Sequence, residues 1–355
     1  MKVGILTFPH SPSLGAMLQM GALYHVIESM GHDVEIINYV SSKVNHKQKA
    51  PVTFKSVMIK VLSALFLKNP EASYREFEDK LKMFPEYPIS ETNEMLKVTC
   101  HFERIIVGSD QVWNPIVTGH DLNFYLEFCN EPEKKASYAA SFGYMQADKK
   151  YIGRIVSLLN DFKYLSVREK DGQKIVKQLT GRDAELVLDP TLLVSADYLR
   201  SIMQPSNRGK KYVLFFCIKP SEKLYNIAKL YAEKYGYELV TIGGRMKDRF
   251  NPRKHPVYGT GPKEFLGLIE DAQCVFTNSF HGMAISVALH SDFFVEFSSD
   301  TNSRLINLTE MLKLEKRVVK GGVPREEQID YEHVDVILEK ERLISMKYLN
   351  TVLQK

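Results

Sequence analysis

Residues 3–38 read VGILTFPHSPSLGAMLQMGALYHVIESMGHDVEIIN, and this opening decides the fold class. Val3–Phe8 is a short apolar run, which indicates a buried strand. Gly15–Met30 has the apolar spacing of a helix, and Gly31–Asp33 is typical of a helix stop. Val34–Asn38 is a second apolar run. A strand, a loop, a helix and a second strand in this order begin a doubly wound α/β fold.

The same alternation returns further along the first half of the chain. Residues 40–100 interrupt it, because they are rich in Lys, Glu and Met, and we interpret them as a helical insertion. Within this insertion, helical spacing occurs at 52–67, 70–83 and 91–99. After it we predict strands at 104–107, 136–140, 164–167 and 184–188, with helices at 147–160 and 169–179.

A second series begins after the polar segment 201–211, whose Pro and Gly are typical of a domain boundary. Strands and helices alternate there at 212–217, 221–235, 237–242, 262–271, 273–277, 281–290, 293–297 and 303–313. We therefore predict an α/β protein of two Rossmann-like domains, 1–203 and 211–332, that face each other across a cleft. A last helix at 338–353 is expected to pack back on the first domain.

The bulk composition narrows the class of protein and of partner. The chain has 355 residues, of which 44% are hydrophobic and 25% charged, as in ordinary globular proteins. The formal net charge is +4, from 47 basic and 43 acidic residues. This charge is too mild to indicate a nucleic-acid partner, but it is compatible with a basic pocket for an anionic substrate.

Cysteine usage and hydropathy indicate the compartment. The four cysteines form no C-x-x-C pair, so we expect buried thiols in a reducing compartment and no zinc site: Cys100, Cys129, Cys217 and Cys274. No stretch approaches the roughly 18 apolar residues that span a bilayer. Segment 52–67 comes closest, and its two lysines favour an amphipathic helix. We expect a cytoplasmic protein that is able to contact the inner face of a membrane.

The most informative polar segment is Thr277–Gly282 (TNSFHG), which lies between a predicted strand and a predicted helix. A helix N-terminus offers free backbone N–H groups and the positive end of the helix dipole, which suits an anion. His281 at this place would lie beside a bound anion and could give a proton to it or to its neighbour. The alternative is a histidine that caps the helix or packs in the core.

Two more strand-to-helix junctions carry an arginine. Asn302, Ser303 and Arg304 follow the predicted strand 293–297. Asn or Ser can cap the next helix, and Arg304 can fork onto a carboxylate or phosphate. The alternative for Arg304 is a solvated side chain in a first helical turn.

Arg168 stands at the corresponding junction after the strand predicted at 164–167. The alternative role for the Arg168 side chain is a salt bridge to Glu169 or Asp171. Sites in doubly wound sheets lie off the carboxyl ends of the strands. We therefore predict that Arg168, His281 and the segment that ends at Arg304 converge on one cleft.

Gly108–Pro115 (GSDQVWNP) follows strand 104–107 and contains the chain's only tryptophan. Dense polar groups beside one aromatic ring suit a sugar, through ring stacking and hydrogen bonds to hydroxyls. The alternative is an Asx-turn with the tryptophan as a core anchor. The candidate acceptor residues here are Ser109, Asp110, Gln111, Trp113 and Asn114.

Other motifs are weak or missing. Asp189-Pro190-Thr191 is typical of a turn, and Gly243-Gly244 lacks the G-x-G-x-x-G spacing of a dinucleotide site. The sequence has no Walker loop, G-x-S-x-G elbow, H-E-x-x-H or EF-hand loop.

Taken in order, these segments resemble the polysaccharide pyruvyl transferase family, in its branch with a serine before F-H-G. They cover most of the chain from 3 to about 315. The similar segments are Gly15–Gln19 with Ala22-Leu23, Gly108–Pro115, Ser137–Gly143, Ser166–Glu169 with Gly172, Asp189–Leu193, Asn278–Gly282 and Asn302–Arg304.

The resemblance implies a GT-B-like fold and a defined reaction. Family members use phosphoenolpyruvate to form a cyclic pyruvate ketal on a sugar diol, in surface or capsular polysaccharide (exopolysaccharide) biosynthesis. His281 matches the catalytic histidine, and Arg168 matches an arginine that meets the donor. Phosphoenolpyruvate is a co-substrate, so the resemblance implies no separate cofactor and no metal. The partner is a sugar or a lipid-linked glycan. The donor-binding set is Arg168, Ser279, Asn302, Ser303 and Arg304.

The chain departs from the family pattern at three places. Ser279 stands where many members carry arginine, and Arg304 is expected to supply that charge. Asn278 replaces a frequent aspartate. The branch usually reads H-x-x-x-N-Y-G near the N-terminus, whereas Pro9–Gly15 (PHSPSLG) places His10 one residue off. We assign His10 to the acceptor side of the cleft.

Two other functions fit the same residues. A GT-B glycosyltransferase would use a nucleotide sugar, and binding of a nucleoside diphosphate would favour it. A non-catalytic glycan-binding relative would fit the altered loop before Gly15.

Overall fold

The computed structural model describes residues 1–43, 70–143, 149–242, 255–257, 259–297, 303–325 and 327–354. These residues form two compact units. The first unit takes its described residues from Met1–Val52, Glu78–Leu193 and Glu339–Lys355, and the second from Thr53–Phe77 and Val194–Leu338. The break expected at 201–211 therefore lies inside the second unit.

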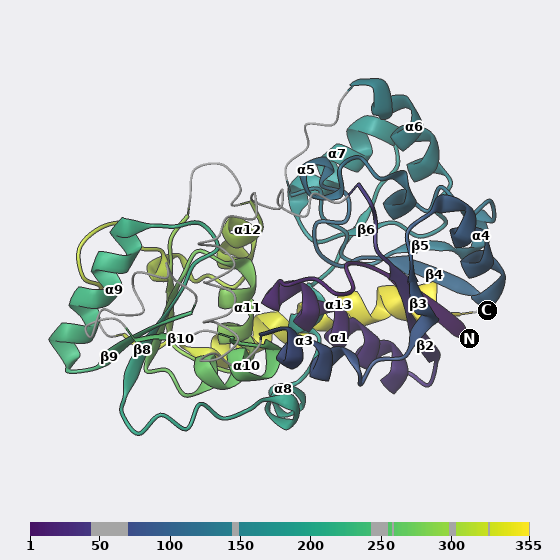
Figure 1. The fold of residues 1–355 in the computed structure, drawn as a ribbon. Coiled ribbons are helices and arrows are strands. Elements are labelled where there is room, and N and C mark those ends of the chain that lie inside the picture. Colours follow the sequence, from purple (N-terminus) through teal and green to yellow (C-terminus); the bar gives the residue numbers. More distant parts are fainter. Residues whose placement is uncertain are drawn as a thin grey trace. The chain divides into compact units, whose positions relative to one another are not determined.

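The first unit is built on a parallel sheet of strand order β3-β2-β1-β4-β5, with helices beside it (Figure 1). A short parallel pair, β6-β7, continues beside β5 through isolated bridges. Strands covered by helices are buried apolar runs, and Val3, Ile5 and Leu6 are fully buried. The strands are β1 (Lys2–Leu6), β2 (Asp33–Tyr39), β3 (Met83–Ile89), β4 (Arg104–Val107), β5 (Lys135–Ser137), β6 (Ser166–Val167) and β7 (Glu185–Leu186). The helices are α1 (Leu14–Ser29), α4 (Thr92–His101), α5 (Pro115–Thr118), α6 (Lys149–Asn160) and α7 (Lys170–Thr180).

The second unit repeats the plan, with the parallel order β10-β9-β8-β11-β12. Its strands are β8 (Tyr212–Phe216), β9 (Glu238–Ile242), β10 (His255–Val257), β11 (Cys274–Thr277) and β12 (Phe293–Val295). Its helices are α8 (Ala196–Ile202), α9 (Glu222–Tyr235), α10 (Pro262–Glu270), α11 (Phe280–Ala288) and α12 (Ser303–Met311). Two more helices have residues in both units: α3 (Pro70–Glu78) and α13 (Tyr331–Val352).

The end of α13 is bonded to the first unit. Ser345 Oγ accepts a hydrogen bond from the Leu188 backbone N–H (2.9 Å). Tyr348 donates its hydroxyl to the Ser137 carbonyl (2.8 Å), at the end of β5. Both side chains are buried, so these polar contacts replace water and fix where the helix lies on the sheet.

The expected helical insertion at 40–100 is only partly correct. Helix α4 lies where a helix was expected, and α3 ends at Glu78 rather than at residue 83. β3 is a strand that the sequence did not reveal, because Pro85 and Pro88 break its apolar pattern. β3 is the edge strand of its sheet, where proline is tolerated since one side of the strand needs no donors. The helix expected at 52–67 lies outside the described residues.

Candidate functional site

Each sheet has one place where the strand order changes direction. In the first unit the chain adds β2 and β3 on one side of β1, and then β4 and β5 on the other. In the second unit β9 and β10 lie on one side of β8, and β11 and β12 on the other. The loops that leave the two central strands diverge at such a switch point, and ligands of doubly wound sheets bind in the crevice they leave. The switch points are therefore β1/β4 and β8/β11.

The TNSFHG segment lies at the β8/β11 switch point. Ser279 is the N-cap of α11, and its Oγ accepts a hydrogen bond from the Gly282 N–H (3.3 Å). His281 is in the first helical turn and is 5% exposed. Position 282 requires glycine, because a Cβ there would lie 2.5 Å from Thr277 Oγ1. The close approach of helix and strand thus places the first turn of α11, which contains His281, at the carboxyl edge of the sheet.

Asn278 ties the two strands of this switch point together. Its Oδ1 accepts from the backbone N–H groups of Ile218 (2.9 Å) and Lys219 (3.4 Å). Its Nδ2 donates to the Lys219 carbonyl (2.7 Å). The loop after β8 is thereby held to the residue that precedes Ser279. Lys219 has no motif that could have marked it in the sequence, and only the strand order brings it here.

The next strand along the sheet, β12, leads to α12. Ser303 and Arg304 are the first two residues of α12, and both are partly exposed. Because β11 and β12 are parallel neighbours, α11 and α12 begin at the same edge of the sheet. Asn302 lies outside the described residues. The second unit thus brings Ser279, His281, Ser303 and Arg304 to adjacent junctions.

Cys217 begins the loop after β8, where a thiol could act as a nucleophile. Burial raises the pKa of this thiol to about 12. A thiol with such a pKa stays protonated at neutral pH and is a poor nucleophile. The expectation of buried thiols holds for Cys129 and Cys274, but it is wrong for Cys100, which is exposed.

In the first unit, Ser109 and Asp110 lie at the β1/β4 switch point. The Ser109 backbone N–H donates to Gln19 Oε1 (3.1 Å), and its carbonyl accepts from Thr7 Oγ1 (3.2 Å). Its hydroxyl donates to Asp189 Oδ2 (3.2 Å). Ser109 is fully buried, so it supports the site rather than facing a ligand. Asp110 follows it with a φ of 72°, a left-handed conformation that Asp tolerates better than most residues.

Arg168 is surrounded by acidic side chains. Its guanidinium lies 2.5 Å from Asp189 Oδ2, 3.2 Å from Asp110 Oδ1 and 4.0 Å from Glu169 Oε2. The Arg168 side chain is 2% exposed. Burial alone would lower the pKa of Arg168, but the charges of Asp189, Asp110 and Glu169 raise it above its ordinary value. The structure therefore places Arg168 in a buried ion network, which favours the salt-bridge interpretation, with a wider set of partners than the sequence suggested.

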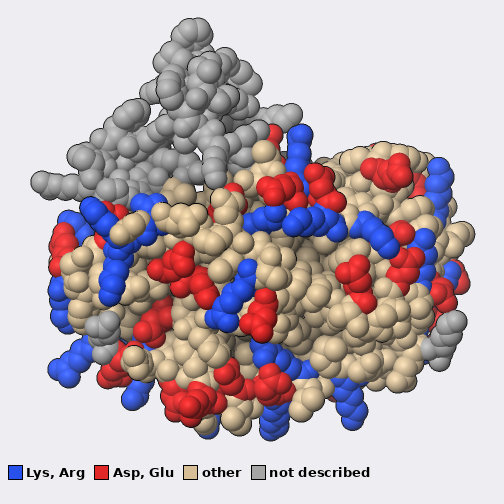
Figure 2. Space-filling model, turned by 90° about the horizontal axis from the view of Figure 1, so that it is seen from below, with Lys and Arg blue, Asp and Glu red and all other residues tan. Residues whose placement is uncertain are grey.

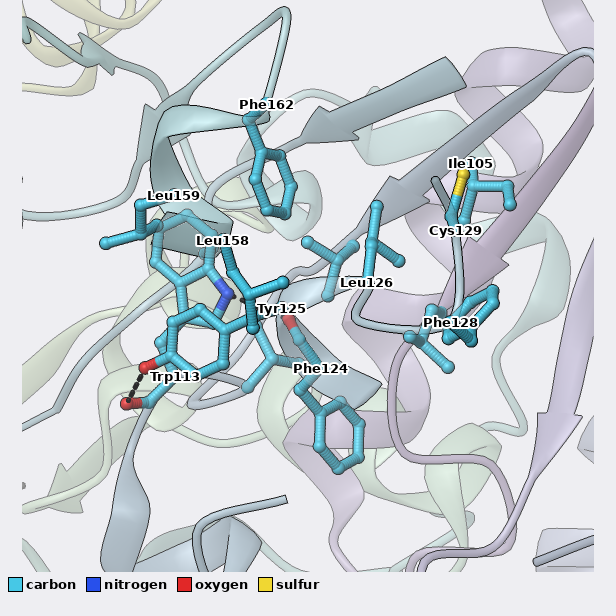
Figure 3. Close-up of a cluster of buried hydrophobic side chains, with 14 of the residues drawn as sticks. Ile105, Trp113, Phe124, Tyr125, Leu126, Phe128, Cys129, Leu158, Leu159 and Phe162 are labelled. Carbon is cyan, nitrogen blue, oxygen red and sulfur yellow. Dashed lines mark hydrogen bonds between the residues drawn. The ribbon is translucent and has the colours of Figure 1, made fainter. Parts of the chain in front are cut away.

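Trp113 belongs to the core, and its assignment to the acceptor sugar is wrong. Its ring is fully buried and stacks on Tyr125, with ring centroids 5.6 Å apart and planes at 6°. Its Nε1 donates to the Phe124 carbonyl (2.9 Å), and Tyr125 donates its hydroxyl to the Trp113 carbonyl (Figure 3). A ring covered in this way has no face for a sugar. The Phe162 ring covers a further side of the Trp113 ring, with the two ring centroids 5.8 Å apart and the ring planes nearly perpendicular.

Gln111 and Asn114 form a small polar pair beside this core. Asn114 Nδ2 donates to Gln111 Oε1 (2.5 Å), and Asn114 Oδ1 caps α5 by accepting from the Ile116 N–H (3.0 Å). A Cβ at Gly143 would lie 2.2 Å from Gln111 Oε1, so the neighbouring loop approaches this pair closely. Asn114 is buried, whereas Gln111 is partly exposed and could contact a ligand.

His10 lies in the loop between β1 and α1, and β1 is one of the two strands of the β1/β4 switch point. Its Nδ1 is 2.9 Å from Glu78 Oε2, and its Nε2 is 2.9 Å from Asn38 Oδ1. Asn38 Nδ2 points to the carbonyls of Pro85 and Glu86, which fixes the amide with its oxygen toward His10. Both ring nitrogens therefore face oxygen atoms, and these contacts fix the orientation of the ring.

Each unit thus gathers part of the predicted set at its own switch point. The first unit links Ser109, Asp110 and Arg168 in one network through Asp189, and it holds His10 in the loop after β1. The expectation that Arg168 and His281 share one cleft joins residues of different units, and it stays a prediction.

Within the described ranges, no group of three His, Cys, Asp or Glu side chains could hold a metal ion. None of the helices described is long and apolar enough to span a lipid bilayer. Basic and acidic side chains are interspersed on the face shown in Figure 2.

Comparison with solved structures shows the fold. The chain is similar to the UDP-GlcNAc 2-epimerase of Neisseria meningitidis bound to UDP-GlcNAc, at 11% identity and a TM-score of 0.53, over 100% of this chain and 95% of that one. It is similar to a Listeria monocytogenes protein described as a UDP-N-acetylglucosamine 2-epimerase, at 13% identity and a TM-score of 0.54, over 98% and 90% of the chains. The Methanocaldococcus jannaschii UDP-GlcNAc 2-epimerase matches at 15% identity and a TM-score of 0.51, over 96% and 92%. These neighbours have the GT-B fold, so the predicted fold class is confirmed.

Comparison of the sequence shows the family. No curated protein matches the chain. A family model described as polysaccharide pyruvyl transferase matches residues 14–293. That range holds the TNSFHG segment, the GSDQVWNP segment and Arg168. The match extends over well more than half of the 355 residues, and the chain therefore belongs to the polysaccharide pyruvyl transferase family, a family of transferases.

Proposed function

We propose that the protein transfers the pyruvyl group of phosphoenolpyruvate to two hydroxyls of a sugar, as a cyclic ketal. The observation that carries this proposal is the position of His281. It lies in the first turn of α11 at the β8/β11 switch point, and the next junction of the same sheet edge presents Arg304. An acid beside a cation at a helix N-terminus suits a substrate that must be protonated at carbon while it carries two anionic groups.

The reaction needs one proton donor at carbon. His281, as imidazolium, gives a proton to C3 of phosphoenolpyruvate, and C2 becomes an oxocarbenium-like electrophile. One sugar hydroxyl attacks C2, and phosphate leaves with breakage of the C2–O bond. The second hydroxyl closes the ketal. The two hydroxyl protons balance the proton given to C3 and the proton taken by the leaving phosphate.

The remaining residues bind and position the substrates. We assign Asn302, Ser303 and Arg304 to the carboxylate and phosphate of the donor, because Arg304 supplies a fixed positive charge at the start of α12. Ser279 is buried and its hydroxyl caps α11, so it supports the donor site by holding the N-terminus of that helix. Asp110, Gln111 and His10 are the candidates for the acceptor, because each has exposed surface at or next to the β1/β4 switch point. Arg168 acts on that site through Asp110, whose carboxylate it holds. The acceptor is a sugar or lipid-linked glycan of surface polysaccharide synthesis.

The proposal is tested by phosphate release from phosphoenolpyruvate, measured with a panel of sugars and lipid-linked glycans. We expect release that depends on the acceptor, and a product heavier than the acceptor by a pyruvate ketal. The matched control replaces phosphoenolpyruvate by UDP-sugars. Sugar transfer from a UDP-sugar, without phosphate release from phosphoenolpyruvate, would establish the glycosyltransferase alternative instead.

A further inference from the structure

We propose that Lys219 binds the anionic groups of the donor and supplies the charge that Ser279 lacks. This inference rests on the proposed function, because the donor is taken to be phosphoenolpyruvate. Lys219 lies in the loop between β8 and α9, and the side-chain amide of Asn278 bonds both its backbone N–H (3.4 Å) and its carbonyl (2.7 Å).

The hydrogen bonds of the Asn278 amide fix the position of the Lys219 backbone. Nδ2 faces a carbonyl, and Oδ1 faces the N–H groups of Ile218 and Lys219, so a flipped amide would lose all three bonds. An aspartate at this position could accept from the two N–H groups, but its second oxygen would oppose the Lys219 carbonyl. Asparagine at position 278, where the family frequently has aspartate, therefore holds the loop that contains Lys219 to the residue before Ser279.

The strand order places this lysine on one flank of α11. β11 lies between β8 and β12, with Thr277 paired to Phe216 on one side and to Val295 on the other. The loop after β8 carries Lys219, and the helix after β12 carries Arg304. The N-terminal turn of α11, with His281, is thus between two junctions that each offer a cation.

The charge on Lys219 is available for a ligand. Lys219 is exposed, and it makes no ion pair with any side chain in the part of the chain that the structure describes. An ammonium on a flexible four-carbon stem is a common phosphate ligand, whereas the planar arginine fork matches a carboxylate. Phosphoenolpyruvate carries one of each group, which fits Lys219 with the phosphate and Arg304 with the carboxylate.

The test compares Lys219→Met with Lys219→Arg and with Lys234→Met, which removes an exposed lysine from the opposite end of α9. We expect Lys219→Met to raise the KM for phosphoenolpyruvate by roughly 10- to 100-fold, the effect of one lost charged hydrogen bond, with kcat changed far less. Lys219→Arg should recover most of the loss, and Lys234→Met should behave as the wild type. Asn278→Ala should raise the same KM, because it removes all three hydrogen bonds that hold the loop, without removing the lysine.

Failure of this assignment can be told from failure of the proposed function. If the wild type releases no phosphate from phosphoenolpyruvate, the proposed function fails, and calorimetry with inorganic phosphate and with UDP tests Lys219 alone. Weaker binding of either ligand by Lys219→Met, but not by Lys234→Met, would still support an anion site at Lys219. If Lys219→Met equals the wild type in the KM for phosphoenolpyruvate, or binds phosphate and UDP as tightly, the assignment is wrong.

Discussion

His281→Gln should lower turnover with phosphoenolpyruvate by about 10²–10⁴-fold, the usual effect of losing a general acid. Glutamine can donate a hydrogen bond from a similar position, but it cannot deliver a proton to C3. Donor binding should weaken much less, because Arg304 and the α11 N-terminus remain. The measurement is single-turnover phosphate release, together with calorimetric binding of phosphoenolpyruvate.

His290→Gln is the matched control for this prediction. His290 is an exposed histidine of the same unit, and its Nε2 lies 3.0 Å from Asp335 Oδ1. Its replacement should leave turnover near the wild-type rate. Because His281 is buried, unfolding curves of the His281→Gln variant are needed to show that the fold is retained. Near-normal turnover in His281→Gln would assign the proton to another group.

Arg168→Met should lower the free energy of unfolding by about 3–5 kcal/mol, the range seen when one partner of a buried ion pair is removed. The variant leaves Asp189, which is fully buried, without the cation that lies 2.5 Å from it. Methionine fills much of the same space, so the loss reports on charge rather than on a cavity. The measurement is urea unfolding followed by circular dichroism.

Two comparisons make the Arg168 result specific. Arg154→Met removes an arginine that is half exposed and lies 2.9 Å from Glu127. This variant should lower the free energy of unfolding by less than about 1 kcal/mol. Adding Asp189→Asn to Arg168→Met should recover part of the stability, because the buried negative charge is then removed as well. If Arg168→Met unfolds like the wild type but has a raised KM for phosphoenolpyruvate, Arg168 is a donor ligand and not the centre of a buried network.

The parts of the fold that follow from local pattern could be predicted from the sequence. The apolar run Val3–Phe8 and the helical spacing of Gly15–Met30 correspond to β1 and α1. The place of Ser279 and His281 at a strand-to-helix junction is confirmed for the same reason, since caps and strand ends are local features. β3 was missed because the two prolines of an edge strand hide its pattern.

The parts that depend on long-range packing could not be predicted. Asp110, Arg168 and Asp189 come from three separate strand ends, and only the assembled sheet brings them within hydrogen-bonding distance. Trp113 stands beside polar residues in the sequence, yet its ring turns into a cluster of aromatic side chains. Lys219 has no sequence signal, because its place beside Asn278 depends on the order of the strands and not on its neighbours in the chain.

The central claim is that His281 protonates C3 of phosphoenolpyruvate during ketal formation, and its most direct test is the reaction in D₂O. The imidazolium exchanges its proton with solvent, so the proton that reaches C3 should be a deuteron. We expect the ketal methyl group to appear as CH₂D in the NMR spectrum of the product, formed by the wild type and formed far more slowly by His281→Gln. A product whose sugar has gained no pyruvyl methyl group, or a CH₂D ketal made by His281→Gln at the wild-type rate, would contradict the account.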